Sequence, residues 1–221
     1  MKLKYSIYAL FAVLVLLTGC GLDNVDAPAS KLMGKITYGG APIGVRGSGE
    51  AIRLQAYQDG YELHNSFDIF VAQDGTFEAT VFDGVYKVVC RDNNGPWLNS
   101  RDTLTVNVSG TTACEYPVTP YYMIENETIA LSGNTLNASC LVKKIVGDKP
   151  IERVMLLLSK TSFVDDVSQI ARKDWEKPEV GTLNLSMDVS GSQSENALFA
   201  RIGVKIEGVG DALYSTIVRL K

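Results

Sequence analysis

The sequence predicts an all-β protein made of two consecutive β-sandwich domains behind a lipoprotein signal peptide and a short tether. Three observations lead to this prediction. Short stretches of alternating apolar and polar residues recur along the chain after residue 31. Glycine, asparagine and aspartate separate these stretches, which is typical of strands joined by turns. Long stretches with the apolar spacing of an amphipathic helix are few.

The first domain is expected over residues 32–117. Its alternation is clearest at Ile52, Leu54 and Ala56, which share one face of a predicted strand. Asp74-Gly75 and Asp83-Gly84 have the composition of tight turns between antiparallel strands. The predicted strands of this domain occupy residues 32–38, 52–58, 67–72, 76–82, 85–91 and 104–108.

The second domain is expected over residues 118–221. Residues 151–159 form a continuous apolar run, as in a central strand of a sandwich. Along residues 198–207 the alternation is unbroken, so one face of that strand is core. Residues 161–177 are charged and carry apolar residues near helical spacing, which predicts a loop containing a short helix. The other predicted strands occupy residues 121–125, 128–131, 135–146, 181–189 and 212–220.

The N-terminus has the plan of a secretory signal peptide, predicted over residues 1–19. Lys2 and Lys4 supply the positive charge, and residues 7–17 are apolar. This apolar run is shorter than the roughly 20 residues that a membrane-spanning helix needs. An uncleaved membrane anchor is therefore the less favoured interpretation.

The segment Leu17-Thr18-Gly19-Cys20 resembles the bacterial lipobox, in which an aliphatic residue and two small residues precede a cysteine. The resemblance implies cleavage before Cys20, attachment of a diacylglycerol to its thiol and acylation of the new amine. Stable anchoring takes more than one acyl chain, so the lipid on Cys20 is expected to hold the mature chain on the membrane. Residues 20–31 are interpreted as the lipidated cysteine and a flexible, polar tether.

The residues after the lipobox and the overall charge bear on location and partners. Position 21 is glycine, whereas an aspartate there retains some lipoproteins in the inner membrane. We therefore expect an outer-membrane lipoprotein at the cell surface, with the periplasmic face as the alternative. The net charge of −4 becomes −6 when the signal peptide removes Lys2 and Lys4. This acidic balance and the lack of any basic run exclude nucleic acid as a partner.

Three cysteines remain when Cys20 is lipidated, namely Cys90, Cys114 and Cys140. An odd number cannot form a closed disulfide framework. Alternation within the strands turns all three towards the core. We favour three buried free thiols over a Cys90–Cys114 bridge. None of the three has the spacing of zinc ligands, and neither a metal nor a cofactor is predicted.

Turn motifs in a fixed order resemble those of the carboxypeptidase-regulatory or transthyretin-like sandwich. Together with the domain that follows, they make the mature chain similar to a Bacteroidetes lipoprotein family of unknown function, domain-of-unknown-function family 3823. The resemblance implies this type of sandwich first and an immunoglobulin-like domain second. Family members tend to be encoded beside glycan-uptake systems, which implies a surface accessory or glycan-binding role, and the family supplies no catalytic residues to transfer. The motifs are Gly34-Lys35-Ile36, Gly39-Gly40-Ala41-Pro42, Ile52-Arg53-Leu54, Asp74-Gly75-Thr76-Phe77, Gly84-Val85-Tyr86, Gly95-Pro96-Trp97 and Val118-Thr119-Pro120-Tyr121.

Aromatic and amide side chains in predicted loops are the candidate glycan-binding residues. Flat rings stack on the apolar faces of sugars, and polar side chains beside them bond the hydroxyls. Trp175 lies between two acids and is expected to be the more exposed ring. For Trp97 and Tyr121, the favoured alternative is that they seal the interface between the domains. The candidates are Asn93, Asn94, Trp97, Tyr121, Tyr122 and Trp175.

Catalysis is not expected from this sequence. His64, the only histidine, lacks the neighbours of a nucleophilic triad. Asp165 and Asp166 are adjacent acids, and a glycosidase needs two acids across a cleft, but a solvated face is the favoured interpretation. Asp102-Thr103-Leu104 resembles the O-glycosylation site of exported Bacteroidetes proteins, which makes Thr103 a candidate for modification.

Three functions follow from these observations. The favoured one is a non-catalytic, envelope-anchored module that binds glycan or assists an outer-membrane uptake system, with a glycan or an outer-membrane protein as its partner. The second is a structural or adhesive lipoprotein that binds other proteins. The third, and least favoured, is a glycoside hydrolase.

Overall fold

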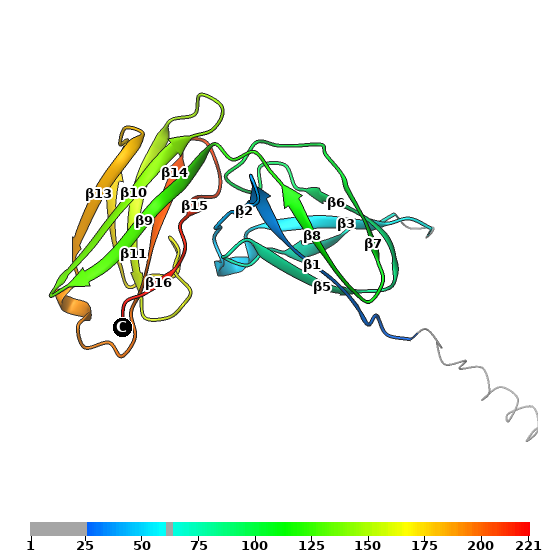
Figure 1. Cartoon of the computed structure of the whole chain (residues 1–221), viewed down its shortest axis with the longest axis horizontal. Coiled ribbons are helices and arrows are strands. Elements are labelled where there is room, and N and C mark those ends of the chain that lie inside the picture. Colours follow the sequence, from blue (N-terminus) through cyan, green and yellow to red (C-terminus); the bar gives the residue numbers. More distant parts are fainter. Residues whose placement is uncertain (1–25, 61–63) are drawn as a thin grey trace, which may run out of the picture.

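Two β-sandwich domains lie next to each other along the long axis of the molecule (Figure 1). The computed structural model describes residues 26–60 and 64–221, so the predicted signal peptide and the predicted lipidation site at Cys20 lie outside the described residues. The predicted all-β, two-domain fold is confirmed. In the described part of the chain, no helix is long and apolar enough to cross a membrane.

The N-terminal domain is built from two four-stranded sheets. One has the order β2-β1-β5 with β8 paired to β1, and the other has the order β4-β3-β6-β7. All pairs are antiparallel except β1 and β8, which run parallel. Leu32, Ile36, Leu54 and Tyr86 fill the space between the sheets and are at most 1% exposed. The strands are β1 (Ser30–Tyr38), β2 (Ala41–Pro42), β3 (Arg53–Gln58), β4 (Phe67–Phe70), β5 (Thr76–Val81), β6 (Gly84–Cys90), β7 (Leu104–Val108) and β8 (Thr111–Pro117).

The C-terminal domain pairs a three-stranded sheet, β13-β10-β9, with a five-stranded sheet, β12-β11-β14-β15, in which β16 also pairs with β14. As predicted, β11 is buried on both faces: Val154 and Leu156 face the main core, and Met155 and Leu157 face a second, smaller cluster. The strands are β9 (Tyr122–Ser132), β10 (Thr135–Lys144), β11 (Ile151–Ser159), β12 (Ala171–Glu176), β13 (Gly181–Asp188), β14 (Phe199–Ile206), β15 (Leu213–Tyr214) and β16 (Val218–Arg219).

The helix predicted within residues 161–177 is wrong. Residues 161–170 form a loop, and the residues after it form β12, antiparallel to β11 with Trp175 opposite Val154. The amide of Ile170 already donates to the carbonyl of Leu158, 2.8 Å away. The open edge of β11 offers backbone N–H and C=O groups that need hydrogen-bond partners, and a short helix could not supply them. Strand pairing with β11 therefore outweighs the weak helical spacing of the apolar residues.

Two strand predictions in the same domain need smaller corrections. The strands predicted at residues 121–125 and 128–131 form one strand, β9, which begins at Tyr122 and passes through Asn126 with a φ of 54° opposite a shift in register on β10. Residues 212–220 are divided into β15 and β16. The division occurs at Ser215, whose hydroxyl accepts the amide hydrogen of Ile202 in place of a backbone carbonyl.

The three remaining cysteines are free thiols, as predicted. Cys90 and Cys140 are buried, whereas Cys114 is only half-buried, so the inward orientation predicted for all three is complete for two. Burial raises the pKa of the Cys90 thiol to about 12 and that of Cys140 to about 11. Both therefore stay protonated at neutral pH and act as small apolar side chains.

Arg201 on β14 joins the two domains. Its side chain is 1% exposed and lies against the ring of Tyr214, 4.7 Å from the ring centre. Burial lowers the pKa of its guanidinium to about 10, which still leaves the group charged at neutral pH. The guanidinium donates to four backbone carbonyls: Ser215 at 2.7 Å, Val164 at 3.3 Å, Val45 at 3.0 Å and Gln73 at 2.6 Å.

Asp165 forms a second connection between the domains. Its carboxylate accepts hydrogen bonds from the amide and hydroxyl of Ser48, both at 2.9 Å, and from the amides of Val167 and Ser168. The loop that follows β11 is thus tied to the N-terminal domain. Burial opposes ionisation, but these hydrogen bonds together lower the pKa of the Asp165 carboxyl below its ordinary value.

Replacing Arg201 with methionine tests how far the domains depend on this side chain. Each buried carbonyl left without a donor costs about 1–3 kcal/mol, so Arg201→Met should lower the free energy of unfolding by roughly 3 kcal/mol or more. Urea denaturation measures the change. The matched control is Arg219→Met, because Arg219 is an exposed arginine that pairs with β14 from β16. Equal stability of the two variants would contradict the role assigned to Arg201.

Asp165→Asn should make the free energy of unfolding less dependent on pH in the acidic range. A carboxyl with a lowered pKa in the folded state stabilises the fold above the ordinary value of 3.8, and this contribution is lost as the pH falls below it. We expect a loss of about 2 kcal/mol at pH 7, since hydrogen bonds to a charged group are worth that much. The loss should shrink below pH 3.8 in denaturation curves. Asp148→Asn, at an exposed aspartate, serves as the control and should show neither effect.

Candidate functional site

The loop between β6 and β7 meets the C-terminal domain at a small polar hollow. The hollow has a volume of about 100 Å³. It brings together three of the predicted site residues, Asn93, Trp97 and Tyr121, with Asn99, which lies close behind Trp97 in the sequence. Lys149 also lines it, and nothing in the sequence indicated this residue. The other lining residues are Gly95, Gly208, Val209 and Gly210.

Trp97 closes the junction between the domains. It is 4% exposed and pairs through its backbone with Pro120. Gly95 passes directly over the indole, with a φ of 137°, and a Cβ at that position would come within 2.2 Å of the ring. A sugar therefore has no free face of Trp97 on which to stack. The structure agrees with the alternative that this ring seals the interface.

The two asparagines of the loop have different roles. The Asn94 side chain accepts from the amide of Arg53 at 2.7 Å and donates to the carbonyl of Ala51 at 2.6 Å. These bonds hold the loop against the start of β3 and turn the Asn94 amide away from the hollow. Asn93 has a φ of 57° and exchanges hydrogen bonds with Asn99 across the loop. The Asn93 and Asn99 amides thus form one polar wall of the hollow.

Tyr121 and Lys149 form the opposite wall. The ring of Tyr121 is half-buried, and the Lys149 ammonium lies 5.4 Å from its centre. The same ammonium donates to the carbonyl of Gly208 at 3.0 Å. Tyr122 is 3% exposed, and its hydroxyl donates to the carbonyl of Lys149 at 2.7 Å. Tyr122 therefore supports this wall from beneath and does not line the hollow.

Trp175 lies on the edge strand β12 and does not line the polar hollow. Its ring is half-buried and packs against the main core, with the Lys173 ammonium 5.1 Å from the ring centre. Lys173 also donates to the carbonyl of Ser186 on β13, so the two side chains cover the open edge of the sandwich. This ring is more exposed than that of Trp97, as expected, but it is not fully open to solvent. Inward alternation along β12 places the ring against the core.

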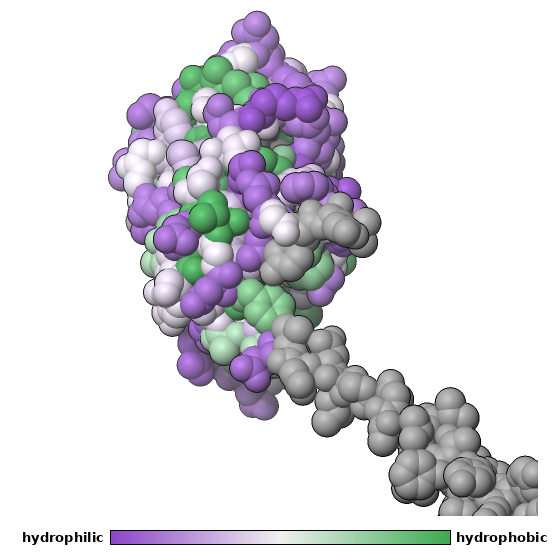
Figure 2. Space-filling model, turned by 90° about the vertical axis from the view of Figure 1, so that its right-hand side faces the viewer, coloured by the Kyte–Doolittle hydropathy of each residue, from purple (hydrophilic) through white to green (hydrophobic). Residues whose placement is uncertain are grey.

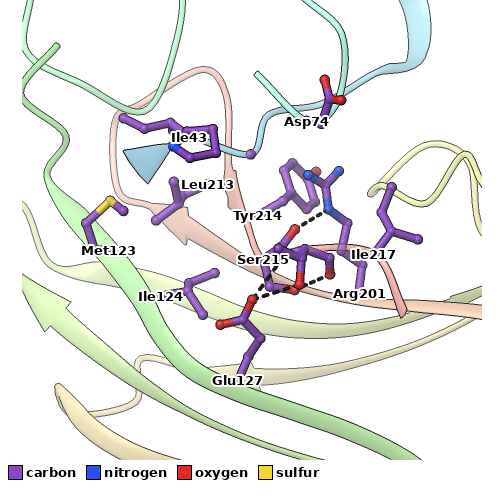
Figure 3. A pocket seen from close by; sticks show the side chains of 13 residues that line it. Ile43, Asp74, Met123, Ile124, Glu127, Arg201, Leu213, Tyr214, Ser215 and Ile217 are labelled. Carbon is purple, nitrogen blue, oxygen red and sulfur yellow. Dashed lines mark hydrogen bonds between the residues drawn. The ribbon is translucent and has the colours of Figure 1, made fainter. Parts of the chain in front are cut away.

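A second hollow, which the sequence did not indicate, lies on another side of the domain junction. It has a volume of about 280 Å³ and a mostly apolar lining (Figure 3). Met123 and Ile124 line it from β9, and Leu213 from β15. On one wall the carboxylate of Glu127 accepts from the amide and hydroxyl of Thr216, at 3.3 and 2.8 Å. We call this hollow the junction groove.

The two adjacent acids do not face each other across a cleft. Asp165 is 0% exposed and bonded within the interface, while Asp166 accepts the hydroxyl hydrogen of Tyr214 at 2.6 Å. Both carboxylates hold the loop after β11, so the solvated face expected for them is wrong for Asp165. Over residues 26–60 and 64–221, no three His, Cys, Asp or Glu side chains gather as metal ligands would. Thr103 is exposed just before β7.

The fold defines an all-β protein of two sandwich domains. One polar and one mostly apolar hollow lie at the junction between these domains. Residues 30–119 match the N-terminal domain of the protein of unknown function DUF3823, and residues 122–219 match its C-terminal domain of unknown function, DUF3823_C. The chain therefore belongs to the DUF3823 family, as the resemblance implied. No curated protein shows a significant match to the chain.

Solved structures agree with this assignment. A DUF3823 family protein from Parabacteroides merdae is 50% identical, with a TM-score of 0.84 over 89% of this chain and 100% of its own. One from Bacteroides ovatus is 31% identical, with a TM-score of 0.80 over 86% and 98%. A protein from Bacteroides uniformis, described as a "putative carbohydrate binding protein", is 16% identical, with a TM-score of 0.71 over 88% and 100%.

Proposed function

We propose that the mature chain is a lipoprotein anchored through Cys20 in the outer membrane, where it acts as a non-catalytic glycan-binding or accessory module of an uptake system. The observation that carries the glycan proposal is the convergence of Asn93, Asn99, Tyr121 and Lys149 on one hollow. Amides and an ammonium can bond sugar hydroxyls, and the tyrosine ring offers an apolar wall beside them.

The size of the polar hollow limits what it can bind. Its volume of about 100 Å³ is well below the roughly 300 Å³ at which small-molecule pockets begin. We therefore expect the hollow to hold the edge of one terminal sugar, with the rest of the glycan outside. The carbohydrate-binding description of the Bacteroides uniformis protein supports the same class of ligand, although the likeness itself extends only to the fold.

A protein partner is the second candidate, and the junction groove favours it. Its apolar lining suits aliphatic side chains of a partner better than sugar hydroxyls. A partner that occupies the groove would contact both domains at once, which is the arrangement expected of a structural or adhesive lipoprotein.

Calorimetry with the soluble chain from Gly21 onward and a panel of polysaccharides tests the glycan proposal. We expect one glycan to bind, and Tyr121→Ala to weaken its binding about tenfold, which corresponds to roughly 1.4 kcal/mol. Asn99→Ala should also weaken it, while Trp175→Ala should leave it unchanged. Thermal unfolding of each variant shows that the fold is retained.

Other outcomes would redirect the proposal. Loss of binding in Trp175→Ala alone would move the sugar site to the edge of β12. Absence of binding by every polysaccharide would overturn direct sugar recognition. In that case, cross-linking to outer-membrane proteins should be compared between the unaltered chain and Leu213→Asp, which places a charge in the junction groove.

A further inference from the structure

The end of the N-terminal domain that lies opposite the C-terminal domain is the place where the tether leaves the fold. At this end β1 begins at Ser30, which pairs with Val81 at the end of β5. β6 begins at Gly84, opposite Val108 at the end of β7. We call this surface the tether end. Figure 2 views the molecule from this side and shows apolar patches interrupted by polar side chains.

Three large apolar side chains are exposed at the tether end. Phe67 is 37% exposed, Phe82 is 40% and Val85 is 45%. Two of them lie beside Tyr86: the ring of Phe67 meets that of Tyr86 edge-on at 6.0 Å, and the Tyr86 hydroxyl donates to the backbone carbonyl of Phe82 at 2.9 Å. Val85 precedes Tyr86 on β6 and points to the opposite, exposed face of that strand. The three exposed side chains therefore lie near Tyr86 at this end, on more than one face of it.

Three charged groups of the tether end have partners within the protein, two of them in an ion pair and one through hydrogen bonds. The Lys87 ammonium lies 2.7 Å from the Asp59 carboxylate. Asp83 accepts hydrogen bonds from the hydroxyl of Ser30 and from the amide of Gly110. A surface with paired charges around apolar side chains loses less hydration energy on contact with lipid than one with unpaired charges.

The length of the tether keeps this end close to the anchor. Ser30 is ten residue steps along the chain from Cys20, and an extended chain spans at most about 3.3–3.6 Å per residue. Given the lipidation of Cys20 proposed above, Ser30 stays within roughly 35 Å of the bilayer whatever path the tether takes. At so short a distance the effective concentration of the lipid surface is high. A contact that is weak by itself is therefore enough to keep this end of the domain on the bilayer.

We propose that the tether end is a membrane-contact surface, in which Phe67, Phe82 and Val85 touch the lipid bilayer that holds the anchor. Aromatic and aliphatic side chains in this position enter the interfacial region, as they do on peripheral membrane proteins. The contact sets the orientation of the whole molecule. β1 has nine residues and spans about 30 Å at 3.3 Å per residue, so the polar hollow and the junction groove stand that far from the membrane.

Site-specific fluorescence on the full-length lipoprotein tests this proposal. The protein carries Cys114→Ser, because Cys114 is the half-buried thiol, and either Val85→Cys or Val180→Cys labelled with an environment-sensitive dye. Val180 is the matched control, since it is a 50% exposed valine of the C-terminal domain. Each protein is reconstituted into vesicles of phosphatidylethanolamine and phosphatidylglycerol, with and without doxyl-labelled lipid. Flotation of the vesicles shows whether the protein is anchored.

We expect the dye at position 85 to shift its emission to the blue and to be quenched by doxyl lipid, and the dye at position 180 to do neither. Adding Phe82→Ser should reduce the quenching at position 85 while flotation is retained. If both dyes behave alike on protein that floats, the tether end does not face lipid, and its exposed apolar side chains serve a protein contact instead. If the protein does not float, the anchor on Cys20 fails, and this proposal fails with it.

Discussion

The structure depends on one buried guanidinium. Arg201 leaves β14 on the face opposite the main core and is 1% exposed, so its N–H groups must bond to the protein. The acceptors are backbone carbonyls from both domains, among them Val45 and Gln73 from the first and Ser215 from the second. A planar fork with fixed donor directions can satisfy such a set only in one arrangement of the domains. The relative position of the two sandwiches is thus specified by hydrogen-bond geometry as well as by apolar contact.

Several other features of the junction follow from this arrangement. The carbonyl of Gly44 accepts the amide hydrogen of Tyr214 at 3.0 Å, and a Cβ on Gly44 would come within 2.3 Å of the Tyr214 carbonyl oxygen. Only glycine allows this approach. Asp165 draws the loop after β11 across to Ser48, and Trp97 closes the remaining side of the junction. Both hollows between the domains are therefore parts of a rigid interface, and a ligand in either would meet a preformed surface.

The exposed apolar side chains and the polar hollow lie at opposite ends of the N-terminal sandwich. The apolar side chains near Tyr86 lie where the tether leaves, and the polar hollow lies where Trp97 meets the C-terminal domain. The strands of a sandwich run from one end to the other, so in the orientation proposed above they act as a spacer between the membrane and the proposed ligand site. This separation would let a glycan or partner reach its site without meeting the bilayer.

The sequence by itself predicted most of the strands, most of their inward faces and the free thiols, but not the strands β2, β8 and β12. Alternation reports which side of a strand is apolar, and so it correctly buried Ile52, Leu54 and the inward residues of β14. The motif order also identified the family. Only the tertiary structure decided what lies across from each strand. Residues 171–176 became a strand because β11 had an open edge, and Trp175 turned inward as a result. Alternation could not show that Arg201 would be buried, because its acceptors lie as far as 156 residues away in the chain. The hollows share this origin, since each is lined by segments that meet only when the two domains pack.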